Sequence, residues 1–163
     1  CWSRKTCVEP VHFAPDGSIP EVEMTTQGAG GPLSAFKPVE AARACLLFGT
    51  VVIGSGGGDR EVLRNISPGS RVAYKYLDFG TGARTVTARV RRNGNAGRIH
   101  LRLGKPWGPE AGRVEIPAGR SDPPGEESFM APVDIPGGIQ ALYLVFEGQG
   151  EDLFEVASFV FDN

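Results

Sequence analysis

Apolar and polar residues alternate along three runs near the middle of the chain, at residues 85–91, 98–103 and 114–116. Successive side chains of a β-strand point to opposite faces, so a period of two predicts strands with one buried face. Asn93-Gly94 separates the first two runs, and glycine supplies the positive φ that a tight hairpin needs. The pattern therefore predicts an antiparallel meander.

Similar runs precede and follow this meander. The segment Lys37 to Thr50 is ambiguous, because its alternation fits a strand while EAARACLL also suits a helical turn. A strand is preferred, since Val51 to Ile53 extends the apolar run. Nine or ten short strands with regular turns predict an all-β chain folded as a sandwich of two antiparallel sheets. The other predicted strands lie at residues 62–66, 71–79, 129–135, 139–147 and 154–161.

Residues 1–35 differ from residues 36–163 and are expected to form a hairpin followed by a glycine-rich linker. Ala14 to Gly17 is a strong turn signal, and 27–32 is too rich in glycine for a regular element. A lone hairpin is barely stable in water, so this appendage must pack on the following domain or on a domain outside this chain.

Composition narrows the classes of partner. The 163 residues include 23 Gly and 13 Pro, which favours short strands joined by turns, and the formal charge of −2 offers no basic surface for nucleic acid. No apolar run approaches the length of a membrane span, so no membrane partner is expected. The chain opens with CWSRKTC, without an initiator methionine or an apolar leader, and reads as a mature product or an excised fragment.

Catalytic motifs are absent from the sequence: there is no nucleophile elbow, HExxH, CxxC or phosphate-binding loop. His12 and His100 lie on strand-like runs, and the interpretation is that both are solvated. The sequence also contains three cysteines. Cys7 and Cys45 could form a disulfide, which fits an oxidising compartment, or they are separate thiols with Cys45 buried as a small apolar residue. No catalytic residue is predicted.

From residue 36 to the end, an ordered set of short segments resembles carbohydrate-binding module family 6. Residues 1–35 resemble the segment that ends the catalytic domain of glycoside hydrolase family 43 and leads into such a module. The resemblance implies a β-sandwich jelly roll, a xylan or arabinoxylan ligand, a glycosidase catalytic domain as partner and a secreted parent enzyme. The segments that carry it are VEA at 39–41, RVAY at 71–74, LDFG at 77–80, GRIHLRL at 97–103, GP at 108–109, LYLVF at 142–146 and LF at 153–154.

Members of that family usually hold a structural calcium ion through two early glutamates and an aspartate in the last strand. Glu40 matches the first glutamate, whereas alanine stands at positions 42 and 157. Calcium takes about six or more oxygen ligands, so the loss of two carboxylates predicts a degenerate site at Glu40.

The resemblance also implies a cleft in which two aromatic rings hold a sugar ring. Here Arg71 stands at the first aromatic position, and residues 119–127, where a tryptophan is usual, contain no aromatic residue. Phe129 is interpreted as a core residue. Asp152 lies near the position of a polar sugar ligand. The sugar cleft is therefore expected to be degenerate.

Trp107, in the turn KPWGP, is the remaining aromatic candidate. A solvent-facing indole could stack on a sugar, or it could cover an edge of the sandwich or a neighbouring domain. The sequence thus predicts a non-catalytic accessory domain that binds xylan or arabinoxylan through Trp107, Arg71 and Asp152. The alternatives are a structural domain that packs on the catalytic domain, and a C-terminal fragment of a hydrolase assembled with a partner chain.

Overall fold

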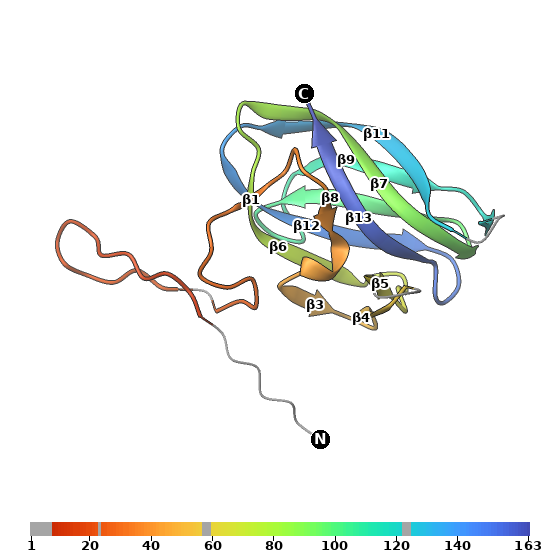
Figure 1. Ribbon diagram of the computed structural model, residues 1–163, viewed down its shortest axis with the longest axis horizontal. Helices are drawn as coiled ribbons and strands as arrows, with labels where there is room; N and C mark the ends of the chain where they lie inside the picture. Colours follow the sequence, from red (N-terminus) through yellow and green to blue (C-terminus); the bar gives the residue numbers. More distant parts are fainter. Residues whose placement is uncertain (1–7, 23, 57–59, 122–124) are drawn as a thin grey trace, which may run out of the picture.

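A computed structural model describes residues 8–22, 24–56, 60–121 and 125–163. Within these ranges the chain forms short and long β-strands and a single turn of 3-10 helix, η1, at Ala41–Arg43 (Figure 1). No helix of the described residues has the length and apolar character of a membrane span. The strands are β1 (Leu33–Ser34), β2 (Val39–Glu40), β3 (Leu46–Phe48), β4 (Val52–Ser55), β5 (Glu61–Arg64), β6 (Arg71–Asp78), β7 (Gly82–Gly94), β8 (Gly97–Leu103), β9 (Glu110–Ile116), β10 (Gly119–Arg120), β11 (Glu127–Pro136), β12 (Ile139–Gly148) and β13 (Phe154–Asp162).

The strands form two layers. Sheet A has the order β6–β12–β8–β9, with β3 and β1 pairing at the free edge of β6. Sheet B has the order β11–β7–β13–β5–β4, with β2 also paired to β13. One residue pair, Val133 of β11 with Gly112 of β9, joins the two sheets at a corner. All pairs are antiparallel except β1 with β6, so the predicted antiparallel sandwich is confirmed.

The core lies between the sheets, where the alternating apolar residues meet. Leu101 of β8, Val86 of β7 and Phe159 of β13 face the same interior. Aromatic rings cross from one layer to the other: Tyr74 packs edge-on against Phe159, with ring centroids 4.9 Å apart, the arrangement that aromatic quadrupoles favour. The Tyr74 hydroxyl donates to the carbonyl of Ala41 at 2.8 Å, so its burial leaves no unpaired polar group.

The three predicted runs form strands, β7, β8 and β9, and β8 pairs with β9 as expected. The predicted meander is partly wrong, because β7 lies in the other sheet, where it pairs with β11 and β13. The prediction for residues 37–50 is partly wrong, because two short strands, β2 and β3, flank the turn η1 instead of forming one strand. Phe129 packs against the core as expected.

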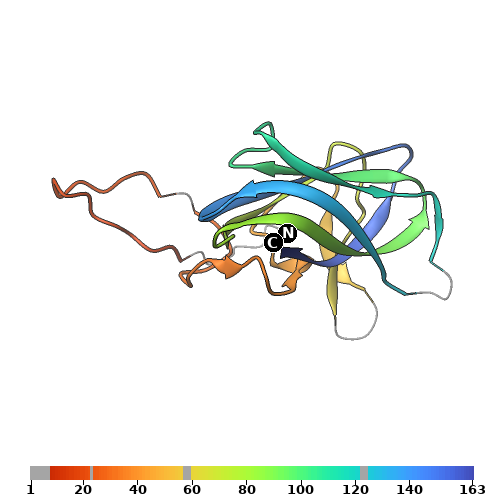
Figure 2. The same ribbon diagram turned by 90° about the horizontal axis from the view of Figure 1, so that it is seen from above.

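The N-terminal segment extends away from the sandwich as a long loop that turns back on itself (Figures 1 and 2). The predicted turn is present, since the Gly17 and Ala14 amides donate to the Ala14 and Ser18 carbonyls. The described residues on either side of it form no strand, so the predicted strand pairing there is wrong. The segment is attached at its base, where Thr26 donates to the Cys45 carbonyl and Gln27 exchanges hydrogen bonds with the backbone of β6.

Candidate functional site

The outer face of sheet A carries two different halves. Directly opposed residues of antiparallel strands share a face, so the register places Arg71, Val145 and His100 in one row across three strands. Phe48 of β3 extends this row at the β6 edge, and Arg113 extends it at the β9 edge. The row therefore runs from Phe48 and Arg71 at the β6 edge, past Val145, to His100 and Arg113 at the β9 edge.

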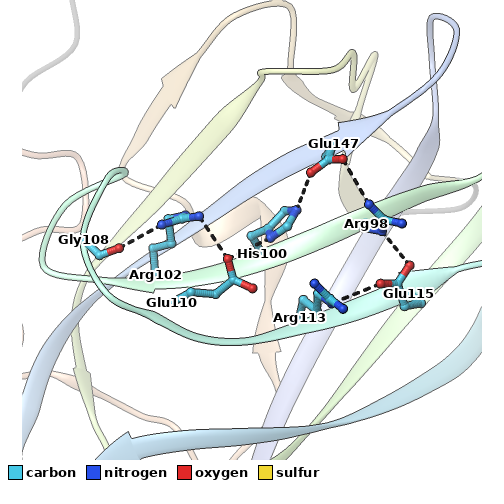
Figure 3. A network of polar contacts seen from close by, with 8 residues as sticks. All are labelled: Arg98, His100, Arg102, Gly108, Glu110, Arg113, Glu115 and Glu147. Carbon is cyan, nitrogen blue, oxygen red and sulfur yellow. Dashed lines mark hydrogen bonds and ion pairs between the residues drawn. The ribbon is translucent and has the colours of Figure 1, made fainter.

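The charged half is a continuous network, named here the charged ladder (Figure 3). The Arg98 guanidinium donates to Glu115 at 2.9 Å and to Glu147 at 3.1 Å. These carboxylates, Glu115 foremost, raise the pKa of the Arg98 guanidinium above its ordinary value, so Arg98 stays charged. The ladder comprises Arg98, His100, Arg102, Glu110, Arg113, Glu115 and Glu147.

His100 is the centre of this ladder, and the interpretation that it is only solvated is wrong. Its side chain is 12% exposed, with Nδ1 3.1 Å from a Glu110 oxygen and Nε2 2.9 Å from a Glu147 oxygen. Sequence alternation placed His100 on the outer face but could not reveal its two carboxylate neighbours, because they lie on β9 and β12. The basic residues at alternate positions of β8, namely Arg98, His100 and Arg102, were the available signal.

The apolar half of the face contains Arg71. Its guanidinium lies over the Phe48 ring, with Cζ 5.0 Å from the ring centroid, a cation–π geometry. The Arg71 Nε is buried and makes no hydrogen bond within the described structure. Four residues further along β6, the Lys75 ammonium lies 5.6 Å from the centre of the Tyr143 ring of β12. Phe48 was not predicted as a site residue, because its contact with Arg71 depends on the pairing of β3 with β6.

Trp107 lies on the loop between β8 and β9 and is 74% exposed. The loop is held in place by several bonds: the Leu103 amide donates to the Pro109 carbonyl at 3.1 Å, and the Gly108 amide donates to Lys105 at 2.9 Å. Arg102 of the charged ladder also donates to the Gly108 carbonyl at 3.0 Å. An exposed indole on a fixed loop is available for stacking against a flat apolar surface.

Asp152 lies on the loop between β12 and β13, with a positive φ of 52°. The next amide, of Leu153, donates to the Ile66 carbonyl, which places this loop beside the segment that enters β6 at Arg71. Asp152 and Arg71 therefore lie at one end of the sandwich.

Trp107 lies at the opposite end. Gly104, where its loop begins, lies about 16 Å from Arg71. This distance combines two strand spacings across the sheet, from β6 to β8, with four residues along the chain from His100 to Gly104. The structure thus does not bring the three predicted sugar-binding residues into one pocket.

The predicted calcium position lies on the other layer, on sheet B, where Arg60, Glu126 and Ala157 line a hollow of about 460 Å³. Glu40 of β2 lies opposite Ser158 of β13, so it is next to Ala157, as the resemblance implied. The Arg60 guanidinium approaches Glu40, with its Nε 3.8 Å from the carboxylate, and it donates to Glu126 at 3.0 and 3.1 Å. Within the described residues no group of three or more His, Cys, Asp or Glu is arranged to hold a metal ion.

Cys45 is buried beside β6, and its thiol donates to the Ala73 carbonyl at 3.2 Å. Its predicted disulfide partner, Cys7, lies outside the described residues. The pairing of these two cysteines stays a prediction.

The comparisons with known proteins agree with this architecture. The model of "Carbohydrate binding module (family 6)" matches residues 48–163, more than half of the chain. The chain belongs to carbohydrate-binding module family 6. A solved family 6 module from Clostridium stercorarium in complex with cellobiose is 32% identical, with a TM-score of 0.74 over 83% of this chain and 99% of that one. The all-β jelly-roll sandwich predicted from the sequence is thereby confirmed.

Longer relatives contain the module as one part. An endo-1,4-beta-xylanase A of Thermoclostridium stercorarium is 34% identical over 76% of this chain and 19% of its own length. A xylosidase/arabinosidase of the same organism is 30% identical over 91% of this chain and 35% of its own. A solved glycoside hydrolase family 43 arabinoxylan arabinofuranohydrolase from Bacillus subtilis, in complex with cellotetraose, is 25% identical, with a TM-score of 0.74 over 95% of this chain and 33% of that one. The chain therefore spans about a fifth to a third of these enzymes.

Proposed function

We propose that this chain is a carbohydrate-binding accessory domain of a xylan-degrading enzyme and that it binds xylan or arabinoxylan through Trp107. The observation that carries the proposal is the exposed indole on a loop fixed by backbone hydrogen bonds and by Arg102. Sugar C–H groups pack on an aromatic face while their hydroxyl groups reach polar side chains at the rim. Lys105 and Glu110 flank the loop and supply such groups.

The separation of Trp107 from Arg71 favours a polymer over a single sugar. Both residues border the outer face of sheet A, and the distance of about 16 Å from Arg71 to Gly104, where the Trp107 loop begins, exceeds the size of one sugar ring. A chain of several rings that starts on Trp107 would run along the charged ladder toward Arg71 and Asp152. The names of the relatives, a xylanase and a xylosidase/arabinosidase, support the choice of polysaccharide.

Affinity electrophoresis of the chain in gels that contain xylan or arabinoxylan tests the proposal. We expect retardation of the parent chain and its loss in Trp107→Ala. The matched control is Met130→Ala, which truncates a similarly exposed apolar residue on sheet B and should leave retardation unchanged. Retardation that survives in Trp107→Ala would refute the role of Trp107, and no retardation of the parent chain on either polysaccharide would refute the function itself.

A second function, packing against a catalytic domain, is favoured by the N-terminal segment. Five large apolar residues between residues 8 and 24 are exposed, with Phe13 at 71%. The match to the isolated family 6 module covers 83% of this chain, whereas the match to the family 43 enzyme covers 95%. We therefore propose that this segment belongs to the interface with a glycosidase catalytic domain of a secreted enzyme. The exposed residues are Val8, Val11, Phe13, Ile19 and Met24.

Binding of the dye 1-anilinonaphthalene-8-sulfonate measures this surface. The chain should enhance its fluorescence, and Phe13→Ser with Ile19→Ser should remove most of the enhancement without changing the far-ultraviolet circular dichroism. If the double variant binds the dye as strongly as the parent chain, the exposed apolar surface lies elsewhere and the proposed interface is wrong.

A further inference from the structure

The three positions that would hold calcium in family members lie close together in this fold, but two of them carry no carboxylate. Glu40 ends β2, Ala42 lies in η1 directly after it, and Ala157 lies beside it on β13. Two of the three positions thus present a methyl group, and Ala157 is buried. Calcium prefers six to eight oxygen ligands at about 2.3–2.6 Å, and this donor set does not fit it.

A guanidinium, that of Arg60, lies beside Glu40, the one carboxylate present at the three positions. Arg60 directs Nε toward Glu40 and Nη1 toward both oxygens of Glu126. Arg89 of β7 adds a second guanidinium, whose Nη2 lies 3.1 Å from Glu126. Two positive and two negative side chains therefore balance at this point, which leaves no local excess of negative charge to attract a divalent cation.

We propose that the Arg60 guanidinium replaces a structural cation and joins three segments of sheet B without metal. The segments are β2 through Glu40, the chain that enters β5 through Arg60 itself, and the chain that enters β11 through Glu126. A guanidinium suits this position because its planar fork offers five N–H donors and stays protonated at any physiological pH. The inference is independent of sugar binding.

The exposure of these side chains determines how much Arg60 contributes to the stability of the fold. The side chains of Arg60 and Glu40 are about half exposed, whereas Glu126 is 21% exposed and receives both arginines. Exposed ion pairs contribute little singly and more as networks. The contribution of Arg60 should therefore be modest and sensitive to salt, because 1 M salt reduces the screening length to about 3 Å.

The first test is a thermal unfolding measurement on the whole chain in calcium chloride and in EDTA. We expect melting temperatures that agree within about 1 °C, and no heat of calcium binding by titration calorimetry. A calcium site filled at one hundred times its Kd would raise the melting temperature by about 5–10 °C in a chain of this size. A rise of that size, reversed by EDTA, would overturn the proposal.

The second test separates Arg60 from an ordinary surface arginine. Arg60→Met keeps the length of the side chain and should lower the melting temperature by about 1–4 °C in low salt, less in 1 M sodium chloride. Arg84→Met is the matched control, because among the described residues Arg84 pairs with the exposed Asp134 alone, and it should change the melting temperature by less than about 1 °C. Equal effects of the two variants would refute the special role of Arg60.

Discussion

Leu101 lies between His100 and Arg102 of the charged ladder, and its own side chain is buried in the core. Its truncation should lower the stability of the fold considerably. The residue is 1% exposed on β8, opposite Leu144 of β12 and Gly112 of β9. Its side chain points between the sheets, where the remaining gap among eight apolar side chains is only about 10 Å³. Leu101→Ala would remove the bulk of a side chain from a space already filled. Such truncations cost about 2–5 kcal/mol, depending on how far the surroundings collapse.

For a chain of this size each kcal/mol lowers the melting temperature by about 2–4 °C, so the expected fall is about 4–20 °C. Thermal unfolding followed by circular dichroism, with urea titration for the free energy, measures it. Leu101→Met conserves most of the volume and is the control, with an expected loss below about 1.5 kcal/mol. A loss below about 1 kcal/mol in Leu101→Ala would show that β8 does not pack against sheet B as described.

Two further predictions concern a carboxylate and a glycine. Hydrogen bonds from the Ser121 hydroxyl and from Arg92 hold the pKa of Glu127 below its ordinary value of 4.5. A carboxylate whose pKa is lower in the folded chain stabilises the fold at pH values above its pKa in the unfolded chain. This stabilisation is lost as the pH falls through the pKa of the folded chain. Glu127→Gln should therefore have a lower melting temperature than the parent chain at pH 7, and this difference should disappear below pH 4.5. A difference that grows in acid would contradict the role of these hydrogen bonds. In Gly97→Ala the new Cβ would lie 2.8 Å from the Glu147 carbonyl oxygen and 2.8 Å from the Phe154 ring, so urea unfolding should show a loss of about 1–3 kcal/mol; an unchanged midpoint would contradict the close contact.

Much of the fold could be predicted from the sequence because the relevant signals are local. The alternation around Val86 and Leu101 specifies strands whatever their partners are. Residues 37–50 were misjudged, because β2 and β3, with two and three residues, are too short to show a period. Their conformation depends on pairing with β13 and β6. The prediction of strands around the Ala14 turn was wrong for a related reason. The described structure has no neighbouring strand with which these residues could pair.

The candidate site was only partly predictable. Trp107 was recognised from its turn, and its exposure follows from that local context. Its distance from Arg71 follows from the order β6–β12–β8, which no local pattern contains. The Arg60 contact with Glu40 spans twenty residues of sequence and depends on how β5 and β2 both pair with β13. Non-local register therefore limits what the sequence reveals about such sites.

The most direct test of sugar binding is a titration of the ¹⁵N-labelled chain with xylohexaose, followed by heteronuclear NMR. The account predicts saturable shifts of the Trp107 indole N–H and of the amides of residues 104–108, with smaller shifts at Arg98, His100 and Arg71. No saturable shift at the Trp107 indole, or shifts confined to sheet B, would contradict the claim that this module binds xylan on the outer face of sheet A.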